Sequence, residues 1–389
     1  MLLPDVNLAL VRTALGELGL DGWLLFDFRG INPITARMIG PIGFSSRRLF
    51  VFLPRVGEPV AIVHKIELKP FADFPGRVIA YATWESLHAA ISEVVGGRQV
   101  AMEISPDDAV PYLDRVPFGV VELIRRLGGT VRPSGALVTR FASAWSAEEL
   151  AGHLVAAEAL AEIAQSALRR AVRLGGTGLT ESQLQAEVID AIHAHGLVFD
   201  HPPIVGFGPN AANPHYEPIP GQDRTLHHDE VVLLDLWAGS RLGTVFADQT
   251  WMGFSGTVVP PKVAEVWRTV RDARDAAIAL VRRKAGKEPL FGYEGDAAAR
   301  GVITAAGYGE YFVHRTGHSI DRDLHGSGPH LDNYETHDDR EILPGAGFSI
   351  EPGIYLSGSF GVRSEVNMVW APEGPRVTPA VPQVELITA

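Results

Sequence analysis

The stretch that decides the fold is Phe348-Ser-Ile-Glu-Pro-Gly-Ile-Tyr355, which Gly361-Val-Arg-Ser-Glu365 follows after a short gap. Both pieces carry the apolar residues of strands, and each contains one carboxylate, Glu351 or Glu365. A carboxylate within a buried strand is costly unless a cation or hydrogen bonds compensate it. The two carboxylates, fourteen residues apart in the sequence, therefore suggest a metal site whose other ligands lie elsewhere in the chain.

The composition limits both fold and function. The chain has 389 residues, of which 46% are hydrophobic, enough for a sizeable core and two domains. Its formal net charge of −12 argues against nucleic acid or an anionic membrane as a partner. Because the chain has no cysteine, disulfides, zinc–thiolate sites and a cysteine nucleophile are excluded, and a metal needs His, Asp or Glu ligands.

The sequence also predicts a cytoplasmic location. The N-terminal stretch MLLPDVNLAL has no basic segment followed by an apolar core, so it does not resemble a signal peptide. No stretch approaches the roughly 18 uninterrupted apolar residues of a membrane span. We therefore expect neither secretion nor membrane insertion.

Residues 1–143 are expected to form an α/β domain, because strand-like runs alternate with helical stretches. A loop rich in Gly and Pro, residues 29–46, is interpreted as a solvated surface loop or, alternatively, as a lid that reaches a site elsewhere. The expected strands are 23–26, 49–53, 60–63, 78–81 and 100–104, and the expected helices are 6–20, 84–95 and 111–127.

Residues 144–389 are expected to form a second, α+β domain. Two capping boxes, in which a Ser or Thr caps the helix start and a Glu or Gln reaches back, open its first helices at Ser146 and Thr180. These helices are expected to end near residues 174 and 195. Strands are expected at 204–207, 231–236 and 244–254, and further helices at 261–284 and 294–306.

The second domain also supplies candidate metal ligands. Asp235 ends an apolar strand, and Asp248 lies in the next one, so a hairpin can bring both acids to one face. His318 offers an imidazole nitrogen. Together with Glu351 and Glu365 these residues form an oxygen-rich ligand set, which favours Mn²⁺, Fe²⁺ or Co²⁺ over a tetrahedral zinc site.

Four neighbouring carboxylates repel one another strongly without cations, so we expect two divalent metal ions rather than one. Mn²⁺ is favoured, with Co²⁺, Fe²⁺ and Zn²⁺ as the other candidates. A two-metal site lowers the pKa of a shared water from about 15.7 to roughly 7 and so provides hydroxide near neutral pH. The pattern thus predicts hydrolysis of a carbonyl compound.

Residues 150–389 resemble the pita-bread metallopeptidase fold that methionine aminopeptidase, aminopeptidase P and prolidase share. The two-domain layout resembles the Xaa-Pro peptidase branch, that is prolidase or aminopeptidase P, which has an additional N-terminal α/β domain. The family's ligands occur in the order Asp, Asp, His, Glu, Glu, and the matching residues are Asp235, Asp248, His318, Glu351 and Glu365. The matching motifs are Pro214-His-Tyr-Glu-Pro218, Gly317-His318, His325, Ile350-Glu-Pro-Gly353 and Val362-Arg-Ser-Glu365.

The resemblance implies roles for these residues. Glu351 is expected to bind metal and also to act as general acid and base, while Glu365 bridges the two ions. His215 and His325 are expected to hydrogen-bond the substrate carbonyl and the oxyanion that forms from it. For Arg363 two roles stay open, pairing with a ligand carboxylate or holding a substrate carboxylate.

The resemblance also implies the reaction, hydrolysis of Xaa-Pro peptide bonds, with a small peptide as substrate and a homodimer as the assembly. We favour an Xaa-Pro dipeptidase (prolidase), because a small N-terminal domain could shorten the cleft. The alternatives are an Xaa-Pro aminopeptidase acting on longer peptides, a hydrolase of another C–N bond, and a non-enzymatic binding module. One departure is the interval of thirteen residues between Asp235 and Asp248, which is longer than usual and predicts a longer hairpin turn around 240–243.

Overall fold

The computed structural model describes residues 2–3 and 6–389. The chain divides into two compact units, Met1–Ala142 and Ser143–Ala389. Residues 1 and 4–5 of the N-terminal stretch, where we expect no signal peptide, lie outside the described residues. Among the helices of the described part, none combines the length and the apolar character needed to cross a membrane.

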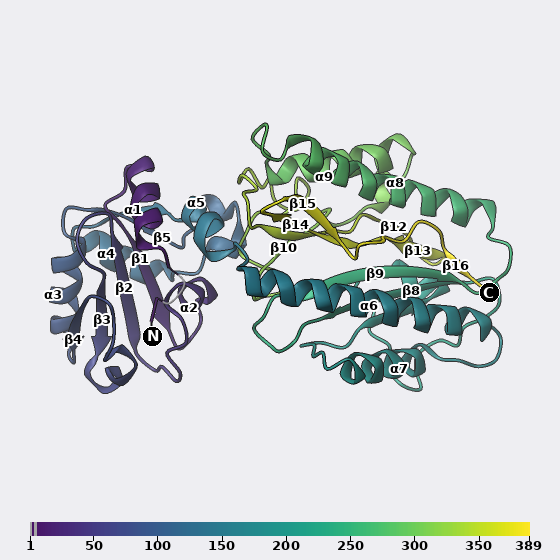
Figure 1. The fold of residues 1–389 in the computed structure, drawn as a ribbon, viewed down its shortest axis with the longest axis horizontal. Coiled ribbons are helices and arrows are strands. Elements are labelled where there is room, and N and C mark those ends of the chain that lie inside the picture. The colour runs from purple at the N-terminus through teal and green to yellow at the C-terminus, as the bar shows by residue number, and fades with distance from the viewer. Residues whose placement is uncertain (1, 4–5) are drawn as a thin grey trace. The chain divides into compact units, whose positions relative to one another are not determined.

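The N-terminal unit is a six-stranded sheet with helices on both faces (Figure 1). The strand order is β4-β3-β2-β1-β5-β6, and β2 alone runs antiparallel to its neighbours. The strands are β1 (Gly22–Phe28), β2 (Arg48–Pro54), β3 (Val60–His64), β4 (Arg77–Tyr81), β5 (Gln99–Met102) and β6 (Thr130–Pro133). The α-helices are α1 (Leu8–Glu17), α2 (Pro33–Ile39), α3 (Trp84–Val95), α4 (Phe118–Arg126) and α5 (Gly135–Leu137).

Alternation of side chains along the strands gives this sheet two separate apolar faces. On β1, Trp23 and Leu25 pack with α1 and α2, whereas Leu24 and Phe26 pack with α3 and α4. Both sets are almost completely buried, which explains why the strand reads as a continuous apolar run rather than an alternating one. The expected α/β domain is therefore confirmed, with a covered sheet at its centre.

Two expectations for this unit were wrong in detail. The expected loop 29–46 contains helix α2, because the Asn32 side chain accepts hydrogen bonds from the backbone N–H groups of Ile34 and Thr35 and Pro33 follows at the first helical position. Asn32 itself is fully buried, so it is not part of a solvated loop. The helix expected at 111–127 begins only at Phe118, after Pro117.

The second unit mixes mainly antiparallel sheets with four α-helices, as the sequence predicts. The helices are α6 (Ala147–Arg173), α7 (Glu181–Ala194), α8 (Pro261–Lys284) and α9 (Gly292–Ala305). The strands are β7 (Ile204–Phe207), β8 (Val231–Ala238), β9 (Ala247–Phe254), β10 (Ser319–Ile320), β11 (Gly347–Ile350), β12 (Gly353–Leu356), β13 (Phe360–Arg363), β14 (Val366–Ala371), β15 (Gly374–Thr378) and β16 (Ile387–Thr388). The sheets have the orders β16-β9-β8-β7, β10-β11-β14-β15 and β12-β13, and β16 alone pairs parallel to its neighbour, β9.

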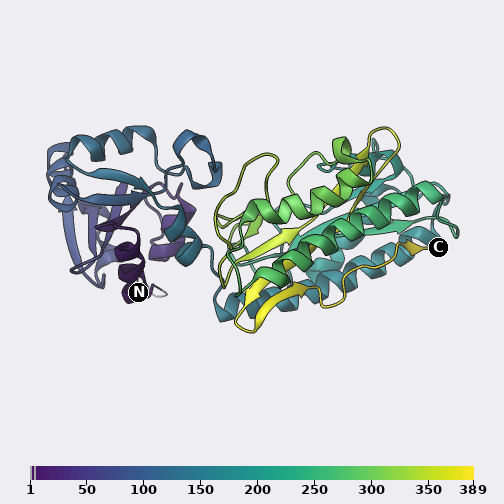
Figure 2. The same ribbon diagram turned by 90° about the horizontal axis from the view of Figure 1, so that it is seen from above.

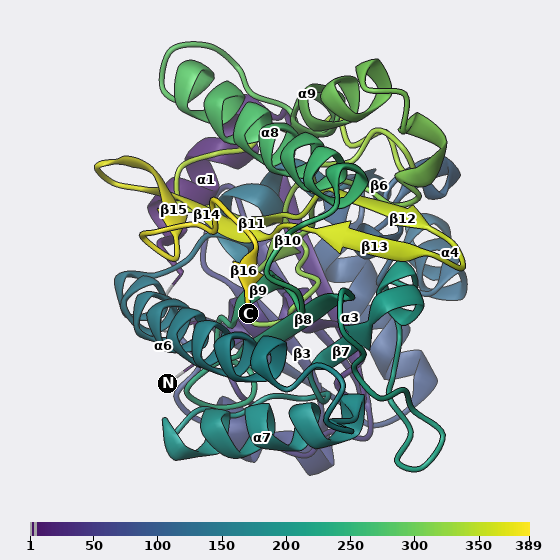
Figure 3. The ribbon, with the colours of Figure 1, turned by 90° about the vertical axis from the view of Figure 1, so that its right-hand side faces the viewer.

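Helices cover this unit on two sides, with the strands between them. Helices α6 and α7 lie on one side and α8 and α9 on the other (Figure 3), and the pair α8 and α9 runs side by side (Figure 2). Along β8, Val232 and Leu234 pack toward α6, whereas Val231 and Leu233 face the opposite layer. Asp235 lies on the same face of β8 as Val231 and Leu233, so its carboxylate points between the sheets and away from α6.

Candidate metal centre

The first two candidate ligands lie on neighbouring strands of one hairpin. Strands β8 and β9 pair antiparallel, with Asp235 opposite Thr250 and Trp237 opposite Asp248. Partners in an antiparallel pair share a face, so both acids point toward the same side of the sheet. Both are buried. The long interval between them is taken up by the turn that connects the strands, residues 239–246, as the sequence suggests.

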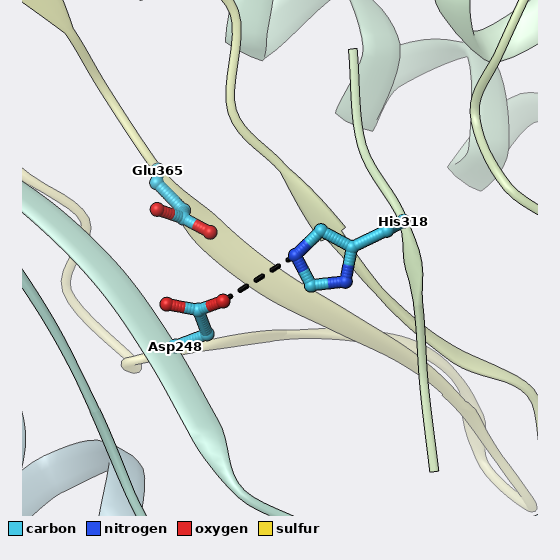
Figure 4. Close-up of side chains that lie close together, drawn as sticks. All are labelled: Asp248, His318 and Glu365. Carbon is cyan, nitrogen blue, oxygen red and sulfur yellow. Dashed lines mark ion pairs between the residues drawn. The ribbon is translucent and has the colours of Figure 1, made fainter. Parts of the chain in front are cut away.

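The remaining candidate ligands come from the second sheet and its edges. His318 directly precedes β10, Glu351 follows β11, and Glu365 lies between β13 and β14. One ligand atom each from Asp248, His318 and Glu365 lies within 4.8 Å of the others, and these side chains point toward one another (Figure 4). The Nε2 atom of His318 is 3.4 Å from Asp248 Oδ2 and also 3.4 Å from Glu351 Oε1.

Backbone and hydroxyl contacts fix the orientation of these ligands. The Nδ1 atom of His318 lies 3.1 Å from the carbonyl oxygen of Ser319; a proton there leaves Nε2 free to bind a cation. The hydroxyl of Ser349 donates to Glu351 Oε1 and accepts from the backbone N–H of His318. The backbone N–H of Asp248 donates to the Asn367 side chain.

Asp235 joins the cluster through Arg363 and Thr250. The buried guanidinium of Arg363 forms an ion pair with Asp235 and donates from Nε to the Thr250 hydroxyl at 2.7 Å. That hydroxyl in turn donates to Glu365 Oε2 at 2.7 Å. The sequence left two roles open for Arg363. In the structure Arg363 pairs with the carboxylate of a candidate metal ligand, Asp235.

The charges of this cluster are poorly balanced. Burial, with repulsion from neighbouring acids, raises the pKa of Asp235 to about 7 despite Arg363, and raises the pKa of Glu365 well above its usual range. Burial also tends to raise the pKa of Glu351, but the charges of His318 and Arg363 outweigh it and hold that pKa at about 2. Within the described residues, Glu365 Oε1 is buried without a hydrogen-bond partner. A bound cation would compensate both the crowded charge and this oxygen, so the residues fit a metal.

The two further histidines lie at the edge of this cluster. The ring centroid of His325 is 4.3 Å from that of His318, and the charge of His318 lowers the pKa of His325 to about 3. The charge of His215 contributes to the same lowering, so His215 and His325 lie within electrostatic range of each other. His215 is exposed and belongs to the segment 208–225, which we call the His215 loop.

Glu181 anchors the His215 loop, a role that the sequence did not reveal. It is the first residue of α7 and fully buried, although an acid in the first turn of a helix is ordinarily solvated. Its carboxylate accepts hydrogen bonds from four donors. These are the N–H of Phe207 at 2.7 Å, the side-chain amide of Asn210 at 3.0 Å, the hydroxyl of Tyr216 at 2.7 Å and the N–H of Arg224 at 2.9 Å.

Other polar residues received no firm role from the sequence. The hydroxyl of Thr250 contacts Asp235, Glu365 and Arg363. Thr250 lies two residues after Asp248 on the same strand, and this spacing indicates that both side chains share a face. His314 bonds through Nε2 to the hydroxyl of Tyr355 and does not join the ligand cluster. His330 is buried and its Nδ1 accepts from the Ser319 N–H, whereas His201 and His337 are on the surface.

Comparison with known proteins agrees with this geometry. The sequence profile of metallopeptidase family M24 matches residues 155–371. A probable dipeptidase PepE of Mycobacterium tuberculosis is 28% identical over 391 residues, which cover 95% of this chain and 92% of that protein. An Xaa-Pro dipeptidase of Lactobacillus helveticus is 36% identical over 191 residues, 49% of this chain and 48% of that protein.

A solved structure extends the similarity to both units. The crystal structure of dipeptidase PepE from Mycobacterium ulcerans matches this structure with a TM-score of 0.77 and 25% sequence identity. The matched region covers 98% of this chain and 96% of the PepE chain. The expected pita-bread fold is therefore confirmed, and so is the expectation of a peptidase. On the match over residues 155–371, the chain belongs to metallopeptidase family M24.

Proposed function

We propose that this protein is an Xaa-Pro dipeptidase that uses two divalent metal ions. The observation that carries the proposal is the buried group of Asp248, His318 and Glu365, with an oxygen of Glu365 that lacks a hydrogen-bond partner among the described residues. Dipeptidases among the similar proteins support the substrate length, and the Lactobacillus helveticus Xaa-Pro dipeptidase supports the bond.

The number of ions is inferred from charge. Carboxylates bind a metal in their ionised form, and four ionised carboxylates with the guanidinium of Arg363 carry a net charge of minus three, which one divalent ion does not balance. Asp235, Asp248, His318, Glu351 and Glu365 would hold the two ions. Because four of these five ligands are carboxylates, Mn²⁺ is favoured, with Co²⁺, Fe²⁺ and Zn²⁺ as alternatives.

Each residue has a distinct task in the proposed reaction. When bound, the metal ions polarise the scissile carbonyl and lower the pKa of the attacking water. Glu351 is ionised, so it can accept the proton of that water and return it to the leaving nitrogen. His325, whose ring lies beside that of His318, and His215 would donate from their ring N–H groups to the carbonyl oxygen as it becomes an oxyanion. Arg363 holds Asp235 in place through their ion pair and opposes the rise of its pKa.

The test compares Xaa-Pro dipeptides with Xaa-Pro-Yaa tripeptides, each assayed with Mn²⁺. Turnover of the dipeptides supports the proposal, whereas turnover of the longer peptides alone would establish an aminopeptidase. Full activity after exhaustive chelation would instead favour a metal-free C–N hydrolase. A protein that takes up no transition metal and hydrolyses neither peptide would be a binding module. The homodimer and the cytoplasmic location stay predictions.

A further inference from the structure

The N-terminal unit contains a hollow of about 510 Å³ at one edge of its sheet. Its walls include the last residues of β1, β3 and β4, which are Phe28, His64 and Tyr81, and the first residue of β2, Arg48. Register explains this meeting point, because Phe28 pairs with Arg48 and His64 with Tyr81. In open α/β sheets, ligands bind beyond the carboxyl ends of the strands, which is where this hollow lies.

The charge of the hollow has one sign. Arg47, Arg48 and His64 line it, and its twelve lining residues include no Asp or Glu, although the whole chain carries a net charge of −12. Among the described residues neither arginine forms an ion pair with a carboxylate; the guanidinium of Arg47 donates to the carbonyl and the hydroxyl of Ser46. The nearby acid Glu67 is already engaged by the backbone N–H and the hydroxyl of Ser46.

Aromatic rings also line the hollow. Trp84, at the first position of α3, is 63% exposed, and Phe28 is 39% exposed. Tyr81 is buried, donates its hydroxyl hydrogen to the carbonyl of Arg48 and meets the His64 ring edge-on at 5.0 Å. Exposed indole and phenyl surface next to guanidinium groups offers stacking to a flat ligand and charge-assisted hydrogen bonds to an anion.

We propose that this hollow binds a small aromatic anion, a flat ring system that carries a carboxylate or a phosphate. The volume lies within the range of small-molecule pockets, roughly 300–1,000 Å³. Because no acid lines the hollow, it offers no anionic partner for an ammonium group, and its arginines repel one, so free amino acids and peptides are disfavoured. The site needs no residue of the metal centre and is independent of the proposed peptidase function.

The test is isothermal titration calorimetry on the metal-loaded full chain with three indoles of similar size. Indole-3-propionate, indole-3-propionamide and tryptamine differ mainly in charge. We expect the anion to bind at least about tenfold more tightly than the amide, and tryptamine not to bind, since a charge-assisted hydrogen bond is roughly twice as strong as a neutral one. Equal affinity for all three, or no binding of the anion at millimolar concentration, would overturn the proposal.

Variants locate the binding. Arg48→Gln is expected to lower the affinity for indole-3-propionate about tenfold. Trp84→Leu is expected to lower the affinity for both the anion and the amide. Arg55→Gln is the matched control, because Arg55 follows the other end of β2 and pairs with Asp21. Peptidase activity and the melting temperature report that each variant is folded. If Arg48→Gln and Arg47→Gln bind the anion as the wild type does, the anion binds elsewhere, for example at the metal centre, and the inference fails.

Discussion

Replacing Tyr216 by Phe removes one of the three donors that hold the His215 loop to Glu181, the fourth donor being the N–H of Phe207 on β7. The phenol hydroxyl donates at 2.7 Å to a fully buried carboxylate whose four partners are all N–H or O–H donors, as a carboxylate anion requires. Such hydrogen bonds contribute about 1.5–3 kcal/mol. The three remaining donors still satisfy the carboxylate, so we expect the fold to survive and the loop alone to loosen.

The expected effect on catalysis follows from that energy. If the ordered loop loses about 1.5 kcal/mol relative to open forms, kcat/KM falls by roughly tenfold, with an upper limit near a hundredfold. Metal content is expected to stay at the wild-type level, because Glu181 and Tyr216 contact none of the five metal-ligand candidates. Hydrogen exchange of residues 208–225 is expected to rise.

Two controls separate positioning from general destabilisation. Tyr308 donates to Glu265 at the same distance of 2.7 Å and lies outside the His215 loop, so Tyr308→Phe is a chemically matched change that should leave kcat/KM unaltered. In a His215→Ala background, Tyr216→Phe is expected to add little, because the loop then has no catalytic side chain to place. Wild-type kcat/KM and loop exchange in Tyr216→Phe, or an equal loss in Tyr308→Phe, would refute the reasoning.

Three further predictions concern buried charge. Glu365→Gln is expected to abolish metal-dependent activity yet raise the melting temperature of the chelated protein. Burial and neighbouring acids raise the pKa of Glu365, so the folded state must keep a proton that the unfolded chain releases near neutral pH, and the amide avoids this cost; calorimetry with and without chelator tests it. Arg363→Met leaves Asp235 unpaired and is expected to cost about 3–5 kcal/mol in urea unfolding, unless Asp235 is also made Asn. Burial raises the pKa of Glu103 to about 7, so Glu103 stays protonated to a higher pH in the folded state than in the unfolded state. Stability should therefore fall by up to about 3 kcal/mol as pH rises from about 4.5 to 7, and Glu103→Gln should flatten that profile.

Local signals in the sequence located many of the elements. The capping boxes at Ser146 and Thr180 form as expected, since their bonds join residues only three apart. Helix α2 was missed because the cap at Asn32 lies among glycines and prolines that indicate a loop, and the burial of Asn32 depends on Glu103, seventy-one residues away. Contacts of that range leave no periodic pattern in the sequence.

The metal-ligand candidates could be found from sequence because each lies in or beside an apolar strand, where an acid stands out. Thr250 and Glu181 could not be assigned roles in the same way. A threonine in a strand is ordinary, and its importance depends on the register that sets it opposite Asp235. Glu181 looks like a first-turn acid, and only the return of a distant loop shows that its carboxylate is buried.

The two halves of the site are therefore positioned by different forces. Asp235 and Asp248 are set by the register of one hairpin, whose backbone bonds are shared over eight residue pairs, so no single hydrogen bond decides their position. His215 lies on a loop that depends on one buried carboxylate. Changes at Glu181 or Tyr216 should accordingly lower turnover while metal remains bound, whereas changes among the acids should remove the metal first. A variant of Tyr216 that loses metal in step with activity would contradict this division.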